Sequence, residues 1–399
     1  MDLKRSTMLG FVLCAVGLGA CASDEPDPRE TRNGTTQNTR ALDFSGFDDA
    51  VEAAIANWND SAPGQAAPVR GASIAIDGKT EGTLHSQGYG EFAADRLYLL
   101  ASASKILSVG VMMRLQDQGK LDIDRPISEY LGDWGEHKPN VTLAQLVSNS
   151  AGMPDANSIL AGIETEAGKL RYAAHLCEWS AAGTLADCGK SIYQDDTPEN
   201  NLEPDKVFRY GGSQWQLAGA VAEKVGGQSW TDLVHETYEP CDVASLGYTN
   251  QSGITEAKFR YPPSFEGDVA DAPATDNPLV EGGAYMTAPD FAKILRMHMR
   301  SGQCGDTRVL SEEAVAQMQT DRVAAYGGMP GEQWVGYGLG WWIAKDYIAD
   351  GGAYGAVPAI GWRGRYGIVL LLEATTDAGW SIMGAVAPLL TETQNARED

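Results

Sequence analysis

The stretch Leu100-Ala101-Ser102-Ala103-Ser104-Lys105-Ile106-Leu107 is followed by a mostly apolar run that ends at Leu115. A helix through it places Ser102 and Lys105 one turn apart on the same face, with the amine within reach of the hydroxyl. Serine becomes a nucleophile only when a base removes its proton, and lysine serves as that base when burial or nearby positive charge lowers its pKa. No other lysine in the chain has a serine three residues before it. The stretch therefore predicts a nucleophile, Ser102, beside its own base, Lys105, on a buried helix.

Length, composition and charge limit the classes of function open to the chain. Its 399 residues suit two domains or one domain with a large insertion, and 43% hydrophobic residues suffice for a substantial core. The net charge of −24 argues against nucleic acid and anionic membrane surfaces as partners, since both attract a basic surface. We expect the charge to form a solubilising acidic surface.

The N-terminus has the features of an export signal. Lys4 and Arg5 precede an apolar run over residues 8–20, which is too short to span a bilayer as a permanent helix. The small residues before Cys21 resemble a bacterial lipoprotein signal, which implies cleavage after residue 20 and a lipid on the Cys21 thiol. Residues 21–43 are expected to be a flexible tether. The resemblance predicts a bacterial cell-envelope lipoprotein that faces the periplasm or the exterior and contacts the membrane through its lipid anchor only.

Four cysteines remain after the signal and the lipidated cysteine are set aside, and an even number in an oxidising compartment favours two disulfides. Of the three possible connectivities we favour Cys177 with Cys188 and Cys241 with Cys304. The chain contains no Cys-x-x-Cys motif, and its five histidines are scattered without ligand spacing. We therefore expect neither a metal site nor a cofactor.

Hydrophobic periodicity predicts strands at both ends of the folded part and helices between them. Helices are expected at residues 44–59, 102–118, 142–148, 214–225, 230–237, 289–300, 311–318 and 380–391, and strands at residues 72–76, 83–89, 337–344, 356–362 and 366–372. This order predicts an α+β fold: an antiparallel sheet flanked by helices, with an inserted all-helical subdomain and a cleft between the two. We place the α/β part at residues 44–115 and 305–392 and the helical insertion at residues 116–304.

Six segments, in order along the chain, resemble motifs of one known family. They are residues 102–105 (SASK), 118–127 (QGKLDIDRPI), 146–154 (LVSNSAGMP), 208–212 (FRYGG), 281–290 (EGGAYMTAPD) and 337–341 (YGLGW). The likeness runs from about residue 45 to residue 390 and is to the serine β-lactamase and DD-peptidase superfamily, in its class C β-lactamase-like branch. That branch also includes penicillin-binding carboxypeptidases and esterases. The resemblance implies a β-lactamase/transpeptidase-like fold and a small-molecule or peptide substrate.

The resemblance also implies a role for each matching residue. Ser102 attacks a carbonyl to form an acyl-enzyme, and Lys105 takes up or directs its proton. Tyr210 lies where the family has a Tyr-x-Asn motif and would serve as a base or as a proton relay to the leaving group. Its phenol would act best as a phenolate stabilised by the ammonium of Lys105. The backbone N–H groups of Ser102 and Gly352 would form the oxyanion hole.

Two departures from the family pattern concern substrate binding. Gly212 replaces the motif asparagine, whose amide would bind a substrate carbonyl, and a neighbouring Ser213 or Gln214 would have to compensate. The third motif, Lys-Thr-Gly or His-x-Gly in the family, best matches residues 349–352, where Ala349 takes the basic position. Asp350 and Gly351 follow it and complete the expected substrate-binding residues. An alternative match at residues 361–364 would restore a cation through Arg363.

A poor site for a carboxylate disfavours β-lactams and D-Ala-D-Ala peptides relative to neutral esters, because losing a charge-assisted contact costs ~2–4 kcal/mol. We therefore expect a serine hydrolase that cleaves ester or amide bonds, as an esterase, a DD-peptidase or a β-lactamase. The alternative is a non-catalytic cell-envelope binding lipoprotein derived from this family. The absence of a Gly-x-Ser-x-Gly motif argues against a Ser-His-Asp hydrolase.

Overall fold

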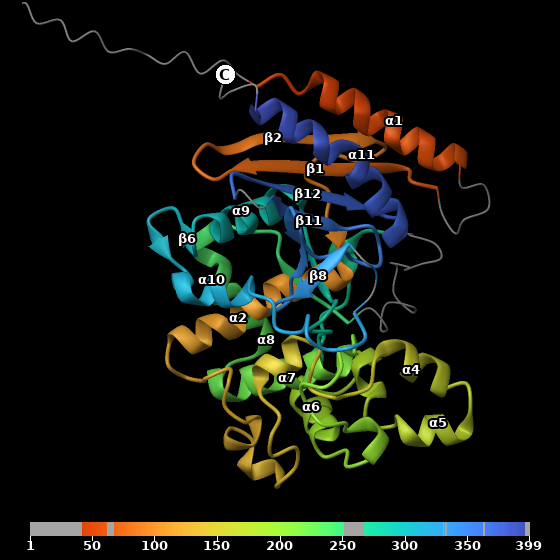
Figure 1. Ribbon diagram of the computed structural model, residues 1–399, viewed down its shortest axis with the longest axis vertical. Coiled ribbons are helices and arrows are strands. Elements are labelled where there is room, and N and C mark those ends of the chain that lie inside the picture. The colour runs from red at the N-terminus through yellow and green to blue at the C-terminus, as the bar shows by residue number, and fades with distance from the viewer. Residues whose placement is uncertain are drawn as a thin grey trace, which may run out of the picture. The chain divides into compact units, whose positions relative to one another are not determined.

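A seven-stranded antiparallel sheet forms the framework of the chain (Figure 1). The computed structural model describes residues 42–61, 68–250, 267–329, 331, 333–361 and 364–395, which belong to one compact unit, Leu42–Asp399. The strands are β1 (Gly71–Gly78), β2 (Gly82–Gly90), β8 (Trp334–Tyr337), β9 (Trp342–Ala344), β10 (Tyr347–Ala349), β11 (Val357–Gly361) and β12 (Tyr366–Leu372). Their spatial order is β2-β1-β12-β11-β10-β9-β8. The first hairpin and the last strands of the chain therefore lie next to each other, as the sequence predicts.

Helices cover both faces of the sheet (Figure 1). The outer face carries α1 (Ser45–Ser61) and α11 (Thr376–Asn395), and the inner face carries α9 (Ala288–Met299) against β1, β11 and β12. All residues of β1 are buried because helices pack on both of its faces. The predicted α+β fold is confirmed, but the predicted insertion of residues 116–304 extends too far, since α9 packs on the sheet.

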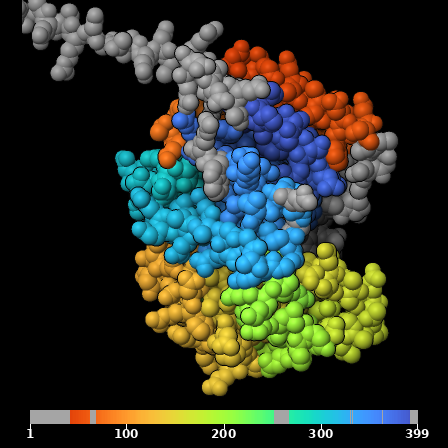
Figure 2. All heavy atoms as spheres, in the orientation of Figure 1, coloured from red at the N-terminus to blue at the C-terminus, as the bar shows by residue number. Residues whose placement is uncertain are grey.

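The helical part of the chain surrounds one buried helix, α2 (Ser104–Asp117). Its other members are α3 (Leu143–Val147), α4 (Ala156–Gly162), α5 (Glu166–Arg171), α6 (Leu185–Tyr193), α7 (Gly212–Gly226), α8 (Trp230–Tyr238) and α10 (Glu312–Met318). Helix α2 packs against α7, α8 and α10, and its residues are buried around its whole circumference. A helix enclosed in this way carries its polar residues into the core with it. Figure 2 shows the light-blue segment around β8 lying against the green helical segment.

A small sheet connects the start of α2 to distant parts of the chain. It consists of β3 (Tyr98–Leu99), β4 (Gly247–Tyr248) and β5 (Ala284–Met286), in the order β3-β5-β4. A separate two-stranded ribbon joins β6 (Gln303–Cys304) to β7 (Thr307–Arg308). The β3–β5 pairing brings the residues before Ser102 beside those after Glu281, so two segments far apart in sequence meet at the predicted nucleophile.

Both predicted disulfides, Cys177–Cys188 and Cys241–Cys304, are present. The strand predicted over residues 337–344 is instead two strands, β8 and β9, separated by a turn, and β10 was not predicted. In the part of the chain that the structure describes, no helix is long and apolar enough to cross a bilayer, and no His, Cys, Asp and Glu side chains gather as metal ligands. The predicted signal, nearly all of the predicted tether and Cys21 lie outside the described residues, and so does Arg363.

Candidate active site

Ser102 lies in a 3-10 turn (Ala101–Ala103) directly before α2, so the helix starts two residues later than predicted. The residue before it, Ala101, has a φ of +45°, a conformation that costs an alanine of the order of 1–2 kcal/mol. Lys105 is fully buried, and its Nζ lies 3.1 Å from Oγ of Ser102, which is partly exposed. The structure thus brings the predicted nucleophile and lysine together, with the hydroxyl on the accessible side.

Hydrogen bonds fix the start of α2 against residues 280–284. The Ser104 hydroxyl accepts a hydrogen bond from the backbone N–H of Ala284 at 3.0 Å, and the Ser108 hydroxyl donates to the carbonyl of Val280 at 2.6 Å. The N–H of Leu100 donates to the carbonyl of Ala284 at 2.9 Å. These contacts leave little freedom to Glu281, which lies between the anchored residues.

Glu281 forms an ion pair with Lys105. Its Oε2 lies 3.0 Å from the lysine Nζ, and its side chain is 16% exposed, whereas that of Lys105 is 0% exposed. Burial acts to lower the pKa of Lys105, but Glu281 and Tyr210 act against it and the pKa is raised. The expectation that Lys105 has a lowered pKa is therefore contradicted. The amine is protonated in the free protein, because nearby negative charge outweighs desolvation.

Tyr210 lies beside the same ammonium group. The Lys105 Nζ is 4.6 Å from the centre of the Tyr210 ring, which stacks on Trp342 at a centroid distance of 5.6 Å. Burial raises the pKa of Tyr210 although Lys105 and a hydrogen bond with Ser102 lower it, so the residue is a neutral phenol and not the expected phenolate. The predicted catalytic residues Ser102, Lys105 and Tyr210 are therefore in one place.

Asn149 shapes the loop that carries Tyr210. Its φ is +59°, its carbonyl accepts from the N–H of Arg209 at 2.8 Å, and its Oδ1 accepts from Nε2 of Gln214 at 3.0 Å and Nε1 of Trp215 at 3.1 Å. Asparagine tolerates this backbone conformation better than most residues. Gln214 is thus engaged in supporting the loop and is not free to replace the missing motif asparagine.

The space beside Gly212 is filled by carboxyl groups. A Cβ at this position would lie 2.5 Å from Oε1 of Glu281 and 3.2 Å from Cδ of Glu178. The Ser213 hydroxyl lies beside Glu178, and burial raises the pKa of that glutamate well above its usual value. The prediction that Gly212 and Ser213 bind substrate is therefore corrected: Gly212 leaves room for two acids, and Ser213 contacts one of them.

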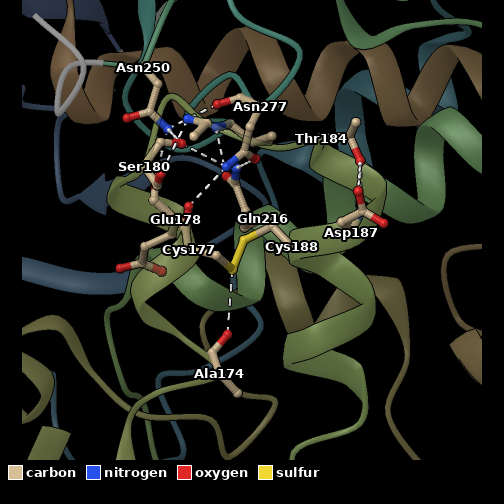
Figure 3. Close-up of a disulfide and its surroundings, with 12 residues drawn as sticks. Ala174, Cys177, Glu178, Ser180, Thr184, Asp187, Cys188, Gln216, Asn250 and Asn277 are labelled. Atoms are coloured by element: carbon tan, nitrogen blue, oxygen red, sulfur yellow. Dashed lines mark hydrogen bonds between the residues drawn. A yellow bond between two sulfur atoms is a disulfide. The ribbon is translucent and has the colours of Figure 1, made fainter.

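A disulfide and an amide network hold Glu178 in place (Figure 3). Cys177, bonded to Cys188, directly precedes it. The Asn250 amide donates to the Glu178 carbonyl at 2.9 Å, and the Asn277 amide donates to the Cys177 carbonyl at 2.9 Å. The Glu178 side chain points away from this network in the figure. The position of the Glu178 carboxyl group is therefore set by the disulfide and by hydrogen bonds to the backbone carbonyls of Cys177 and Glu178.

Asp350, rather than Ala349, faces the nucleophile. Ala349 packs in the core beneath α1 and α11, and a Cβ on Gly351 would meet Nε1 of Trp380 in α11 at 2.6 Å. A Cβ on Gly352 would instead meet the carbonyl of Leu100 at 2.1 Å. Side chains alternate along extended backbone, so Asp350 points to the inner side. Burial raises the pKa of Asp350 well above its usual value, although the charge of Lys105 opposes the rise.

The predicted oxyanion hole is corrected at one position. The N–H of Gly352 donates to the carbonyl of Ala356 at 2.8 Å and is therefore engaged within its own turn. Gly351 faces α11, so its expected contact with substrate is not supported either. The backbone at Gly352 nevertheless lies close to the carbonyl of Leu100, two residues before the nucleophile.

Comparison with known proteins assigns the chain to a family. A family model described as Beta-lactamase matches residues 61–385. The chain belongs to the beta-lactamase family. Penicillin-binding protein 4 of Amycolatopsis lactamdurans is 26% identical over 320 residues, which are 75% of each chain. This relative agrees with the branch that the sequence motifs indicate.

Solved structures show the same beta-lactamase-family fold. EstCE1, a hydrolase with promiscuous acyltransferase activity, has a TM-score of 0.65 and 18% identity, covering 86% of this chain and 100% of that chain. The D-amino acid amidase of Ochrobactrum anthropi has a TM-score of 0.62 and 16% identity, covering 89% and 100%. The family and these neighbours are hydrolases, and they include esterase-like and amidase members.

Three residues of the site, Glu281, Glu178 and Trp342, have no role in the sequence-based predictions. Glu281 directly precedes two glycines in a segment that resembles the family, and Gly212 stands where the family has asparagine. A glycine in place of a larger side chain indicates that another group fills the space. Gly212 was therefore the one sign in the sequence that further residues belong to the site. The sequence alone did not indicate that carboxyl groups fill the space.

Proposed function

We propose that the protein is a serine hydrolase that cleaves ester or amide bonds through an acyl-enzyme on Ser102. The observation that carries the proposal is the 3.1 Å contact between Oγ of Ser102 and Nζ of a fully buried lysine. Burying an amine is costly, and a chain without catalytic use for Lys105 gains nothing from placing it beside a partly exposed hydroxyl.

The proton of Ser102 needs an acceptor, and Lys105 begins as an ammonium. Lys105 passes one proton to the carboxylate of Glu281 and takes the proton of Ser102, while the serine Oγ forms a bond to the substrate carbonyl carbon. The 3.0 Å ion pair provides the path. After this step the carbonyl oxygen carries the negative charge, the amine is protonated again and Glu281 holds the extra proton. The backbone N–H of Ser102 donates to the oxyanion.

Tyr210 completes the cycle. As a neutral phenol it donates its proton to the leaving oxygen or nitrogen when the carbonyl–leaving-group bond breaks, and Lys105 replaces that proton. Water then attacks the acyl-enzyme with the same groups in reverse, which releases the acid and restores Ser102. Every proton that leaves one group in this cycle is taken up by another.

Asp350 influences which substrates fit. A buried acid in this segment supplies no positive charge to a substrate carboxylate, which disfavours β-lactams relative to esters and amides without an acid near the scissile bond. Ester or amide hydrolysis is therefore the activity to measure first.

Hydrolysis of p-nitrophenyl butyrate and nitrocefin by residues 44–399 tests the proposal, with Ser102→Ala as the variant. We expect ester turnover that falls at least 1000-fold in Ser102→Ala and far weaker turnover of nitrocefin. The control is Ser61→Ala, which removes an exposed serine hydroxyl at the end of α1. Inactivity on both substrates would favour the binding-lipoprotein alternative.

We also propose that the protein is a cell-envelope lipoprotein anchored through Cys21. Support comes from the signal-like sequence and from two disulfides, which persist in oxidising compartments. Metabolic labelling of the full chain with a palmitate analogue in a bacterial host is expected to mark the wild type and not Cys21→Ala. Equal labelling of both would contradict the anchor.

A further inference from the structure

Glu178 is a buried acid of the site that takes no part in the proton transfers of the proposed mechanism. The residue is 0% exposed, and within the described part of the chain neither of its side-chain oxygens makes a hydrogen bond of good geometry. A carboxylate in such a place is costly unless a partner matches its charge, so a carboxyl group placed there tends to keep its proton.

The two oxygens of Glu281 face different neighbours. Oε2 lies 3.0 Å from Nζ of Lys105. Oε1 lies on the side of Gly212, at 2.5 Å from the position that a Cβ on this glycine would take, and Cδ of Glu178 is 3.2 Å from the same position. The carboxyl groups of Glu178 and Glu281 therefore adjoin one small space, which the glycine leaves open.

One ammonium serves both of these acids. Two ionised carboxyl groups beside each other repel, and in a buried site water screens the repulsion little, so one member of such a pair keeps its proton. Burial raises the pKa of Glu178 well above its usual value, and Glu281 adds to the rise, whereas Ser213 and Lys105 oppose it. Glu281 holds the ion pair with Lys105 and is therefore the ionised member.

The charge of Glu281 also acts on three further titratable groups, those of Tyr210, Tyr337 and Asp350. Burial is the largest cause that raises the pKa of each, and it favours the neutral form of all three. The cluster then contains one negative charge, on Glu281, and one positive charge, on Lys105.

We propose that Glu178 is a positioning residue that stays protonated and donates a hydrogen bond to Oε1 of Glu281, so that Oε2 stays directed at Lys105. The inference rests on the proposed serine hydrolase function and adds a residue to it. A hydrogen bond from a neutral acid to a carboxylate is strong and brings no further charge into the site. In the proposed cycle Oε2 takes up and returns the proton of Lys105, while the proton of Glu178 stays on Glu178.

Infrared difference spectroscopy detects the proton on Glu178. The C=O stretch of a protonated carboxyl group lies at a higher frequency than the bands of a carboxylate or an amide. The spectrum of the wild type minus that of Glu178→Gln, both at pH 7, should therefore contain a positive band of this kind, because any band of protonated Asp350 is common to both and cancels. Absence of the band would overturn the inference. Failure of Glu178→Gln to fold would also overturn it, since an amide matches a neutral acid in size and charge.

Kinetics test whether the hydrogen bond positions Glu281. Glu178→Met keeps the length of the side chain and removes the donor. Its kcat for p-nitrophenyl butyrate should fall about tenfold or more with little change in KM, because Glu281 acts on Lys105 and not on the substrate. Glu178→Gln, whose amide donates in place of the acid, should recover most of this loss.

The matched control is Glu236→Met, which changes a glutamate that pairs with Arg114 outside the site and should leave kcat and KM unchanged. Equal losses of kcat in Glu178→Met and Glu178→Gln, alongside Ser102-dependent turnover by the wild type, would overturn the inference and leave the proposed function intact. Without Ser102-dependent turnover the proposed function fails and the positioning role fails with it. The infrared band, which needs neither turnover nor the Met variant, reports separately on the proton of Glu178.

Discussion

Replacing Glu281 by glutamine tests whether the buried ion pair stabilises the site. The change keeps the size of the side chain and removes its charge, which leaves the ammonium of Lys105 buried without its 3.0 Å partner. Removing one member of a buried pair costs ~3–5 kcal/mol. Because Asp350 and Glu178 still face the ammonium, we expect the lower end, ~3 kcal/mol. The pKa of Lys105 should fall in the variant, since Glu281 is the strongest of the groups that raise it.

A matched control separates this effect from the loss of any glutamate. Glu236 pairs with Arg114 at 3.5 Å, but these side chains are 45% and 22% exposed. Water screens such a pair, so Glu236→Gln should cost ~1 kcal/mol or less.

Urea-induced unfolding at pH 7 with intact disulfides measures both variants by tryptophan fluorescence. If Glu281→Gln lowers the free energy of unfolding by no more than Glu236→Gln does, the buried ion pair does not stabilise the site. That result would mean that the Lys105 charge does not depend on Glu281. The fall in the pKa of Lys105 is measured by the pH dependence of inactivation by a fluorophosphonate, whose acid limb should move to lower pH in Glu281→Gln.

Three further outcomes are expected. Gly212→Ala should lower stability and ester turnover, because the added Cβ meets Oε1 of Glu281 at 2.5 Å; unchanged melting and kinetics would contradict this. Burial lowers the pKa of His298 to about 4 from 6.5, so the unfolded chain takes up a proton first as pH falls from 6.5 to 4. Folding stability should drop by ~3 kcal/mol more in the wild type than in His298→Gln over that range, as measured by unfolding at each pH. Replacing both cysteines of Cys241–Cys304 by serine should destabilise the fold ~1.5 kcal/mol more than the same change in Cys177–Cys188, given sequence separations of 63 and 11. Loss of Cys177–Cys188 should lower ester turnover more, since this disulfide directly precedes Glu178 of the site. The reverse order of the two losses in stability would contradict the prediction.

Local sequence patterns were sufficient to predict the fold class and the contact between Ser102 and Lys105. The hairpin of β1 and β2 and the strands β11 and β12 follow from periodicity, and the Ser102–Lys105 spacing follows from helical geometry. Both disulfide pairs were also predicted correctly. The strands and the Ser102–Lys105 contact depend on residues close together in the sequence, and the disulfide pairs are one of only three possible pairings.

The electrostatic character of the site could not be predicted, because it depends on contacts between distant segments. Glu281 is 176 residues from Lys105, and no local pattern connects them. The sequence therefore suggested a lysine with a lowered pKa, whereas its acidic neighbours raise it. The assignment of Ala349 to the basic position was off by one residue, and in an extended strand that shift moves a side chain to the opposite face.

Trapping of an acyl-enzyme is the decisive experiment for covalent catalysis by Ser102. The protein is mixed with p-nitrophenyl butyrate, quenched with acid within milliseconds and digested for mass spectrometry. Covalent catalysis by Ser102 predicts a butyryl group on the peptide that contains this residue, present in the wild type and absent in Ser102→Ala. Ester turnover without any adduct on Ser102, or an adduct on another residue, would contradict it.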